Sequence, residues 1–149
     1  SRPELMQRIT AAYLRDESTH IADLLAQAPV SDANTQAQAV ALVGFSQGAM
    51  LSLHMAPRRA EPIAAVIVIS GQLLQPERLV AETCAKPPVL VMHGDRDEVV
   101  PFPEMTATCN ALVGAGFETY GHVMEGAGHT IAQDGLATAL AFLTKTLPN

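Results

Sequence analysis

The ten residues AVALVGFSQG, from Ala39 to Gly48, join a short apolar run to a serine that has a glycine two positions away on each side. The run from Ala39 to Phe45 is uncharged and partly β-branched, which is typical of a strand buried on both faces of a sheet. After the turn Gly44 to Gly48, the sequence favours a helix that closes before Pro57. A buried strand, a tight turn and a helix form the repeating unit of α/β proteins, so we expect an α/β architecture.

Three further strands are predicted downstream: Ile63 to Ser70, Pro88 to His93 and Phe117 to Val123. Helices are predicted over Pro3 to Ala28, from Pro76, from Pro103 to Gly114, and over the C-terminal leucines, with a polar loop at 29–38. Because parallel strands require crossover connections, four buried strands alternating with helices predict one domain with a mainly parallel sheet and helices on both faces. In such sheets ligands bind at the carboxyl ends of the strands.

Two of the predicted helices carry apolar stripes. The helix that begins at Pro103 presents Met105, Cys109, Leu112 and Val113 on one face. The last helix presents Leu136, Leu140, Leu143 and Leu147, at spacings of four, three and four residues. We expect both stripes to pack against the core.

The composition excludes several classes of function. The 149 residues are 48% hydrophobic and 16% charged, which suits one ordinary globular domain. A formal net charge of −6 and the absence of Trp argue against a nucleic-acid partner. The longest apolar run, Ile63 to Ile69, is far shorter than the roughly 20 residues of a membrane-spanning helix. We therefore expect no nucleic-acid binding and no membrane span.

Cys84 and Cys109 are the two cysteines, and they occur without a CxxC motif or a Cys/His cluster. This arrangement provides no metal framework, and we expect two free, buried thiols. The chain opens at Ser1 without a Met, so that an N-terminal segment can precede it and the lack of a signal peptide decides little. We expect a cytoplasmic protein.

The motif Gly44-Phe45-Ser46-Gln47-Gly48 is a G-x-S-x-G placed between a predicted strand and a predicted helix. A sharp turn of this kind strains the serine backbone, needs glycine where chain segments approach closely, and exposes the hydroxyl at the rim of the sheet. The following helix directs backbone N–H groups at developing negative charge. A glycine-rich turn with an incidental serine is the alternative, but the context favours a nucleophile.

A serine hydroxyl needs a base to accept its proton, and the chain has five histidines. His129 follows the fourth predicted strand and the small residues 126–128, which allow an imidazole to reach over the rim of the sheet. The other four are His20 and His54 in predicted helices, His122 within a strand, and His93 at a strand end, where a structural hydrogen bond is expected. His129 is therefore the candidate base.

The third group should be a carboxylate that fixes the tautomer of the imidazole and stabilises the imidazolium. Asp95, Asp97 and Glu98 follow the third predicted strand, and the order serine, acid, histidine fits an elbow serine. Asp95 could instead accept backbone N–H bonds within its own turn. Spacing alone does not separate Asp95 from Asp97.

Three segments together resemble the phospholipase/carboxylesterase family of small α/β-hydrolases, which includes acyl-protein thioesterases and bacterial carboxylesterases. They are GFSQGA at 44–49, HGDRDEVVP at 93–101 and Gly128-His129, and the similarity extends in order and spacing from Ala39 to the C-terminus. The glutamine after the serine and the H-G-D-x-D-x-V-V-P run are more specific than the elbow. The resemblance implies the C-terminal portion of an α/β-hydrolase fold.

By this resemblance Ser46 is the nucleophile, Asp97 the acid and His129 the base. The backbone N–H of Gln47 is one oxyanion donor. Leu73 and Leu74 lie near the acyl pocket, unless they are plain core residues. The implied activity is that of a serine esterase that cleaves a small acyl ester through an acyl-enzyme without metal or organic cofactor. Lysophospholipase and acyl-protein thioesterase activities are the alternatives within this class.

One part of the family pattern is missing from the sequence. Members of the family carry a strand and an H-G-x-G-type loop upstream of the elbow, and this loop donates the second oxyanion N–H. Nothing before Ala39 resembles them, so the resemblance implies that these elements exist as a further N-terminal segment or a separate chain. Loss of one oxyanion donor costs about 10² to 10³ in turnover. The alternative from another class is therefore an inactive, hydrolase-like binding or assembly subunit, and the oligomeric state stays open.

Overall fold

A computed structural model of the chain describes residues 40–148. Its four strands form one parallel sheet in the order β1-β2-β3-β4, with β1 at Ala41–Phe45, β2 at Ala65–Ile69, β3 at Val89–Gly94 and β4 at Thr119–Met124. The helices are α4 (Gln47–Met55), α5 (Leu79–Glu82), α6 (Pro103–Gly114) and α7 (Gln133–Thr146), with 3-10 turns η1 (Ala56–Arg58) and η2 (Pro76–Arg78). The predicted strands and their parallel arrangement are confirmed, with ends shifted by one or two residues.

The predicted helix Pro3 to Ala28 and the loop at 29–38 lie outside the described residues, as do His20 and Ala39. Pro103 opens α6 as predicted, whereas Pro76 opens only the short turn η2 ahead of the four-residue helix α5.

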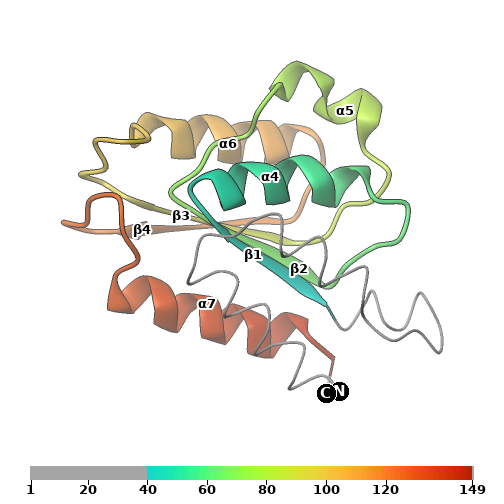
Figure 1. Cartoon of the computed structure of the whole chain (residues 1–149). Helices are drawn as coiled ribbons and strands as arrows, with labels where there is room; N and C mark the ends of the chain where they lie inside the picture. The colour runs from blue at the N-terminus through green and yellow to red at the C-terminus, as the bar shows by residue number, and fades with distance from the viewer. Residues whose placement is uncertain (1–39, 149) are drawn as a thin grey trace.

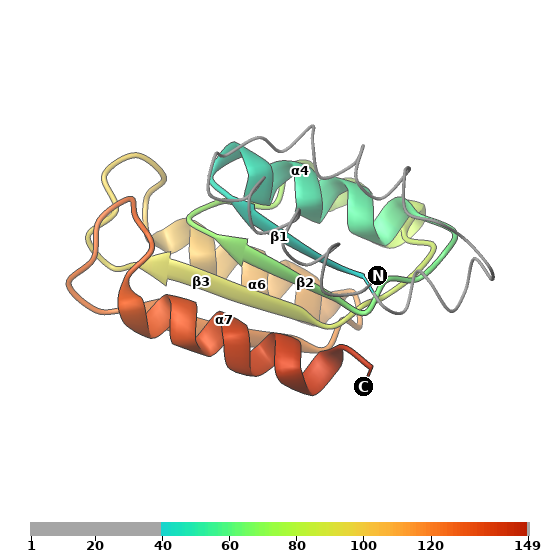
Figure 2. The same cartoon turned by 60° about the horizontal axis from the view of Figure 1, so that its bottom comes forward.

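Helices cover both faces of the sheet (Figure 1). Helices α4 and α6 lie over one face and α7 lies over the other, an arrangement that the second view also shows (Figure 2). Strands β1, β2 and β3 are buried almost throughout, and Ile67, Ile69 and Met92 are among their fully buried side chains. Burial on both faces is the reason that uncharged, β-branched segments form the centre of this sheet.

Strand β4 corrects the prediction of four buried strands. Tyr120, Gly121 and Val123 are exposed, and among the described residues β4 pairs only with β3. The composition of β4, which includes Tyr and His, tolerates water, whereas the apolar β1 at the other edge of the described sheet is buried.

Helix α6 buries Met105 and Leu112 as its stripe predicts, with Cys109 half-buried. Val113, however, is 61% exposed, so the predicted stripe is too wide at this position. Thr108 takes its place on the inner face.

The predicted leucine stripe of α7 is half wrong. Leu147 is buried and Leu143 is half-buried, but Leu136 and Leu140 are exposed. The inner face of the helix consists of Gly135, Ala139 and Phe142 instead. Small side chains allow a helix to lie close to a sheet, so they define the contact face here although the leucines are more hydrophobic.

Both cysteines are free thiols, but the predicted burial is wrong. Cys84 is exposed in the loop that follows α5, and Cys109 is half-buried in α6. Within residues 40–148, every helix is too short or too polar to cross a lipid bilayer.

Candidate active site

Ser46 occupies the sharp turn between β1 and α4. Its backbone angles, φ 57° and ψ −116°, lie in a region that L-residues rarely adopt, at a typical cost of about 1–3 kcal/mol. The Ser46 N–H donates to the carbonyl of Ile69 in β2 (2.9 Å), and the Met50 N–H donates to the Ser46 carbonyl (3.1 Å). A Cβ atom at Gly44 would overlap the backbone of Gly48. The G-x-S-x-G motif therefore forms the strained turn that its sequence predicts.

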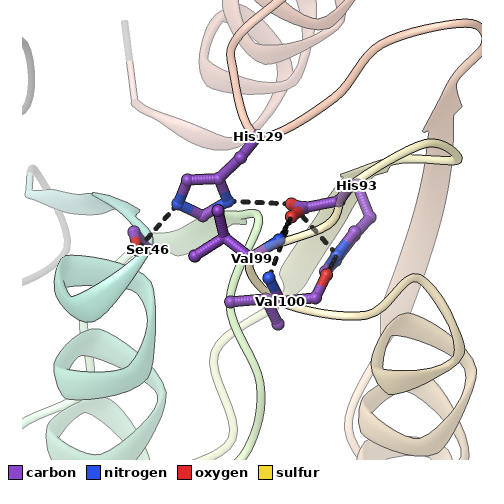
Figure 3. Close-up of polar contacts among 6 residues, drawn as sticks. Ser46, His93, Val99, Val100 and His129 are labelled. Atoms are coloured by element: carbon purple, nitrogen blue, oxygen red, sulfur yellow. Dashed lines mark hydrogen bonds and ion pairs between the residues drawn. The ribbon is translucent and has the colours of Figure 1, made fainter.

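The structure brings Ser46, Asp97 and His129 into one hydrogen-bonded chain (Figure 3). His129 Nε2 lies 3.0 Å from Ser46 Oγ, and His129 Nδ1 lies 2.8 Å from Asp97 Oδ2. The three residues follow β1, β3 and β4, whose carboxyl ends share one rim of the sheet. With the His129 proton on Nδ1, the imidazole donates to the carboxylate and Nε2 can accept a proton from the serine.

Asp97 is a buried carboxylate with donors on both oxygens. Oδ1 accepts N–H bonds from Val99 and Val100, each at 2.9 Å, and Oδ2 accepts from His129. Burial alone would raise the pKa of the Asp97 carboxyl, but the hydrogen bonds from His129, Val100 and Val99 outweigh it and hold this pKa below the ordinary 3.8. Asp97 is therefore an anion at neutral pH.

The two other carboxylates that follow β3 lie elsewhere. Asp95 is exposed, and its Oδ1 accepts the N–H of Gly126 at 2.8 Å. This bond joins the loop that follows β3 to the loop that follows β4, rather than closing a turn of its own as the sequence had suggested. The Arg96 N–H strengthens the same junction by donating to the Ala127 carbonyl at 2.9 Å. Glu98 is exposed.

The remaining described histidines lie outside this chain of hydrogen bonds. His93 is fully buried and bonds to the Val100 carbonyl, as expected for a structural histidine. His54 lies in α4, and His122 in β4 pairs with Asp134 at the start of α7, at 2.6 Å. Among residues 40–148, no three His, Cys, Asp or Glu side chains are grouped to hold a metal ion.

Phe45 is a site residue that the sequence analysis missed. Its ring lies against His129, with the ring centroids 4.9 Å apart and the planes tilted by 40°. Packing of this kind restricts the rotation of the imidazole. The available signal was the position of Phe45 itself, at the end of β1 and directly before the serine.

A groove of about 610 Å³ begins next to the elbow, at Gln47. It is lined by Gln47, Met50, Leu51, His54, Leu74 and Gln75. Of the two predicted pocket residues, Leu74 lines this groove, whereas Leu73 is buried and its N–H donates to Thr108 Oγ1 at 3.0 Å. As the first residue of α4, Gln47 has a backbone N–H with no acceptor inside the helix.

We expect Gly94→Ala to lower the free energy of unfolding by about 1–3 kcal/mol, because overpacking of a close-packed region has a cost of this size. A Cβ atom at Gly94 would collide with the carbonyl oxygens of Ala127 and Gly128, which precede His129. Urea unfolding measures this loss. Gly114→Ala is the matched control because a Cβ there meets nothing within 4 Å. Equal stability of the two variants would contradict this contact.

The stability of the chain should depend on the ionisation of Asp97. Because the folded-state pKa of this carboxyl is depressed, its contribution to the free energy of unfolding is complete above the unfolded-state value near 3.8. The contribution is lost as the pH falls through the lower folded-state pKa. Urea unfolding of the wild type and of Asp97→Asn between neutral pH and about pH 3 tests this: the difference in stability should shrink at the acidic end. A constant difference would contradict the depressed pKa.

Comparisons with known proteins identify the family of this chain. Residues 6–147 match the family model described as Phospholipase/Carboxylesterase. An acyl-protein thioesterase 1 homolog from Dictyostelium discoideum is 30% identical over 135 residues, covering 89% of this chain and 60% of that protein. The esterase YpfH of Escherichia coli is 34% identical over 115 residues, covering 75% of this chain and 47% of that protein. The crystal structure of esterase PE8 superimposes with a TM-score of 0.76 at 42% identity, covering 96% of this chain and 65% of that one.

The chain thus spans less than two thirds of each of these relatives. The match to the family model nevertheless extends over nearly the whole sequence, and the parallel sheet agrees with the α/β-hydrolase fold of the esterases. The chain belongs to the phospholipase/carboxylesterase family of α/β-hydrolases.

Proposed function

We propose that this protein is a serine hydrolase that cleaves carboxylic esters through an acyl-enzyme. The observation that carries the proposal is the continuous hydrogen-bonded chain from Ser46 Oγ through His129 to Asp97. It lies at the carboxyl ends of parallel strands and beside the N-terminus of α4. These features supply the nucleophile, the base and a positive dipole that the reaction needs.

In the first half of the reaction, Ser46 Oγ attacks the acyl carbon while His129 Nε2 takes the hydroxyl proton. The Asp97 carboxylate stabilises the imidazolium, and the Gln47 N–H donates to the oxyanion of the tetrahedral intermediate. Collapse of the intermediate breaks the ester bond, and the imidazolium gives its proton to the leaving alcohol. Water activated by His129 then attacks the acyl-enzyme, which releases the carboxylic acid and restores the serine.

A second oxyanion donor belongs to this proposal. We infer that it comes from polypeptide outside residues 40–148, either a further segment or a separate chain, because family relatives extend well beyond the matched region. We also infer a cytoplasmic location, in which the free thiols of Cys84 and Cys109 remain reduced.

The groove next to Gln47 supports an apolar acyl group as the part of the substrate that is recognised. Met50, Leu51 and Leu74 provide the apolar wall of this groove, which begins at Gln47, the residue after Ser46. The same groove fits a thioester, and the similarity to an acyl-protein thioesterase homolog supports this as the second candidate activity. Hydrolysis of matched oxygen esters and thioesters of one acyl chain distinguishes the two.

We expect the groove to favour longer acyl chains, and Leu74→Asp to remove this preference. Each methylene group in an apolar pocket contributes about tenfold or more to kcat/KM, and a carboxylate at position 74 opposes the burial of such groups. Hydrolysis of p-nitrophenyl esters of increasing chain length measures the effect. Val80→Asp is the control because Val80 is 74% exposed on α5 and does not line the groove. The same chain-length profile in both variants would assign the acyl group to another surface.

A further inference from the structure

His93 is a buried histidine that the proposed reaction does not use. It lies near the end of β3, four residues before Asp97, and none of its surface is exposed. Its Nε2 atom lies 2.9 Å from the carbonyl oxygen of Val100 and 3.5 Å from Oδ2 of Asp97. The same Oδ2 atom binds Nδ1 of His129, so the two imidazole rings stand on either side of one carboxylate (Figure 3).

The surroundings of His93 determine which nitrogen carries its proton. Nε2 faces a carbonyl and a carboxylate oxygen, both of which can only accept hydrogen bonds. Nδ1 is buried and has no hydrogen-bond partner among the described residues. A proton on Nδ1 would leave a buried donor unsatisfied, at about 1–3 kcal/mol, and would turn the Nε2 lone pair toward two oxygens. The arrangement therefore requires the Nε2–H tautomer, with Nδ1 unprotonated.

The position of this ring is fixed on several sides. The bond to Val100 holds its edge, and the ring of Phe102 packs against it edge-on, with centroids 6.0 Å apart. Val100 in turn donates its own N–H to Asp97 Oδ1. Among residues 40–148, the titratable groups paired with the Asp97 carboxylate are His93 and His129. His93 thus holds the turn that supplies two donors to the carboxylate, and its Nε2 atom lies close to Oδ2.

We propose that His93 is a positioning residue, whose Nε2–H bond to the Val100 carbonyl holds the turn that donates to Asp97 and so keeps the Asp97 carboxylate in the orientation that meets His129. This inference rests on the proposed function of Ser46, His129 and Asp97. The bond from His93 fixes the position of Val100, whose N–H opposes rotation of the carboxylate, and the polar Nε2–H, 3.5 Å from Oδ2, adds a favourable dipole next to the oxygen that binds His129. In this orientation Oδ2 accepts the Nδ1–H of His129, which leaves His129 Nε2 free to accept the proton of Ser46.

Two variants of the full chain separate this role from simple packing. His93→Leu fills the same space with an apolar side chain and removes the Nε2–H donor. His93→Gln instead places an amide N–H near the position of Nε2. We expect His93→Leu to slow fluorophosphonate labelling of Ser46 by about 10- to 100-fold, as loss of an orienting partner does at metal-bound imidazoles. The acid limb of the labelling profile should move to higher pH, because a carboxylate without the Nε2–H dipole beside Oδ2 holds the imidazolium of His129 more strongly. His93→Gln should recover most of the rate.

Proton NMR distinguishes a positioning role of His93 from a role in packing alone, because it observes the hydrogen bond between His129 and Asp97 directly. The His129 Nδ1–H that is bonded to Asp97 should give a far-downfield signal in the wild type, shifted or lost in His93→Leu and restored in His93→Gln. An unchanged signal and pH profile in folded His93→Leu would overturn the proposal. If the wild type does not react with the fluorophosphonate, the proposed function fails, while this signal still decides the role of His93.

The tautomer of His93 can be tested without any substitution. Nitrogen-15 shifts and long-range proton couplings of the wild-type imidazole should identify a protonated Nε2 and a bare Nδ1. The opposite tautomer would overturn the proposal, and this measurement remains decisive if His93→Leu does not fold.

Discussion

Ser46→Ala is expected to reduce ester hydrolysis by about 10⁶-fold and to abolish labelling by a fluorophosphonate. Removal of the nucleophile from a complete triad lowers kcat by about 10⁶-fold, because no other step of the mechanism can replace the acyl-enzyme. In this protein the hydroxyl lies 3.0 Å from His129 Nε2, on a turn whose strain serves to expose it. Hydrolysis of a short p-nitrophenyl ester and mass spectrometry of the labelled chain measure both effects.

Ser52→Ala is the matched control for this experiment. Ser52 lies on the buried face of the same helix, and its loss removes a hydroxyl while the hydrogen-bonded chain of Ser46, His129 and Asp97 remains. We expect this variant to keep both activity and labelling. A wild-type chain that neither hydrolyses esters nor reacts at Ser46 would instead support the inactive binding or assembly subunit.

The sequence predicted the elbow well because the local signals agree with one another. An apolar strand, a serine flanked by glycines and a helix start follow in direct succession, and each is a short-range feature. The rim that unites Ser46 with His129 then follows from the parallel order of the strands, which βαβ connections require. The positions of the glycines and of the apolar runs were sufficient to predict this part of the fold.

The choice between Asp95 and Asp97 could not come from local spacing, because both follow the same strand. Asp97 is selected by the path of the loop, which turns its carboxylate inward to the N–H groups of Val99 and Val100. Asp95 points to a different loop and meets Gly126. The bond between Asp95 and Gly126 joins two loops at positions 31 residues apart, which local spacing does not reveal. The resemblance to a family identified Asp97 where periodicity did not.

The inner face of α7 shows another limit of pattern reading. Leucine spacing marks the most hydrophobic stripe of a helix, but the contact with a sheet depends on how closely the two backbones approach. Gly135 and Ala139 permit a close approach, and Leu136 and Leu140 consequently lie to the side of the interface. A sequence pattern of small residues is weaker than a leucine stripe and was overlooked for that reason.

Asp97→Asn should lower kcat by about 10⁴-fold while the chain remains folded. An amide at this position can donate to His129 Nδ1, which would favour the tautomer with the proton on Nε2. That nitrogen could then no longer accept the proton of Ser46. The imidazolium would also lose the anion that stabilises it at 2.8 Å. Steady-state ester hydrolysis measures kcat, and far-UV circular dichroism checks the fold.

Asp95→Asn is the matched control for Asp97→Asn. The two aspartates follow the same strand, but Asp95 is exposed and accepts only the N–H of Gly126 in the described structure. The amide oxygen of the variant can still accept that bond, so we expect a change in kcat of less than about tenfold. If instead Asp95→Asn were the more damaging variant, His129 would have to take its partner from the other aspartate. The buried carboxylate at 97 would then be a structural anchor for the turn at Val99 and Val100 rather than part of the catalytic machinery.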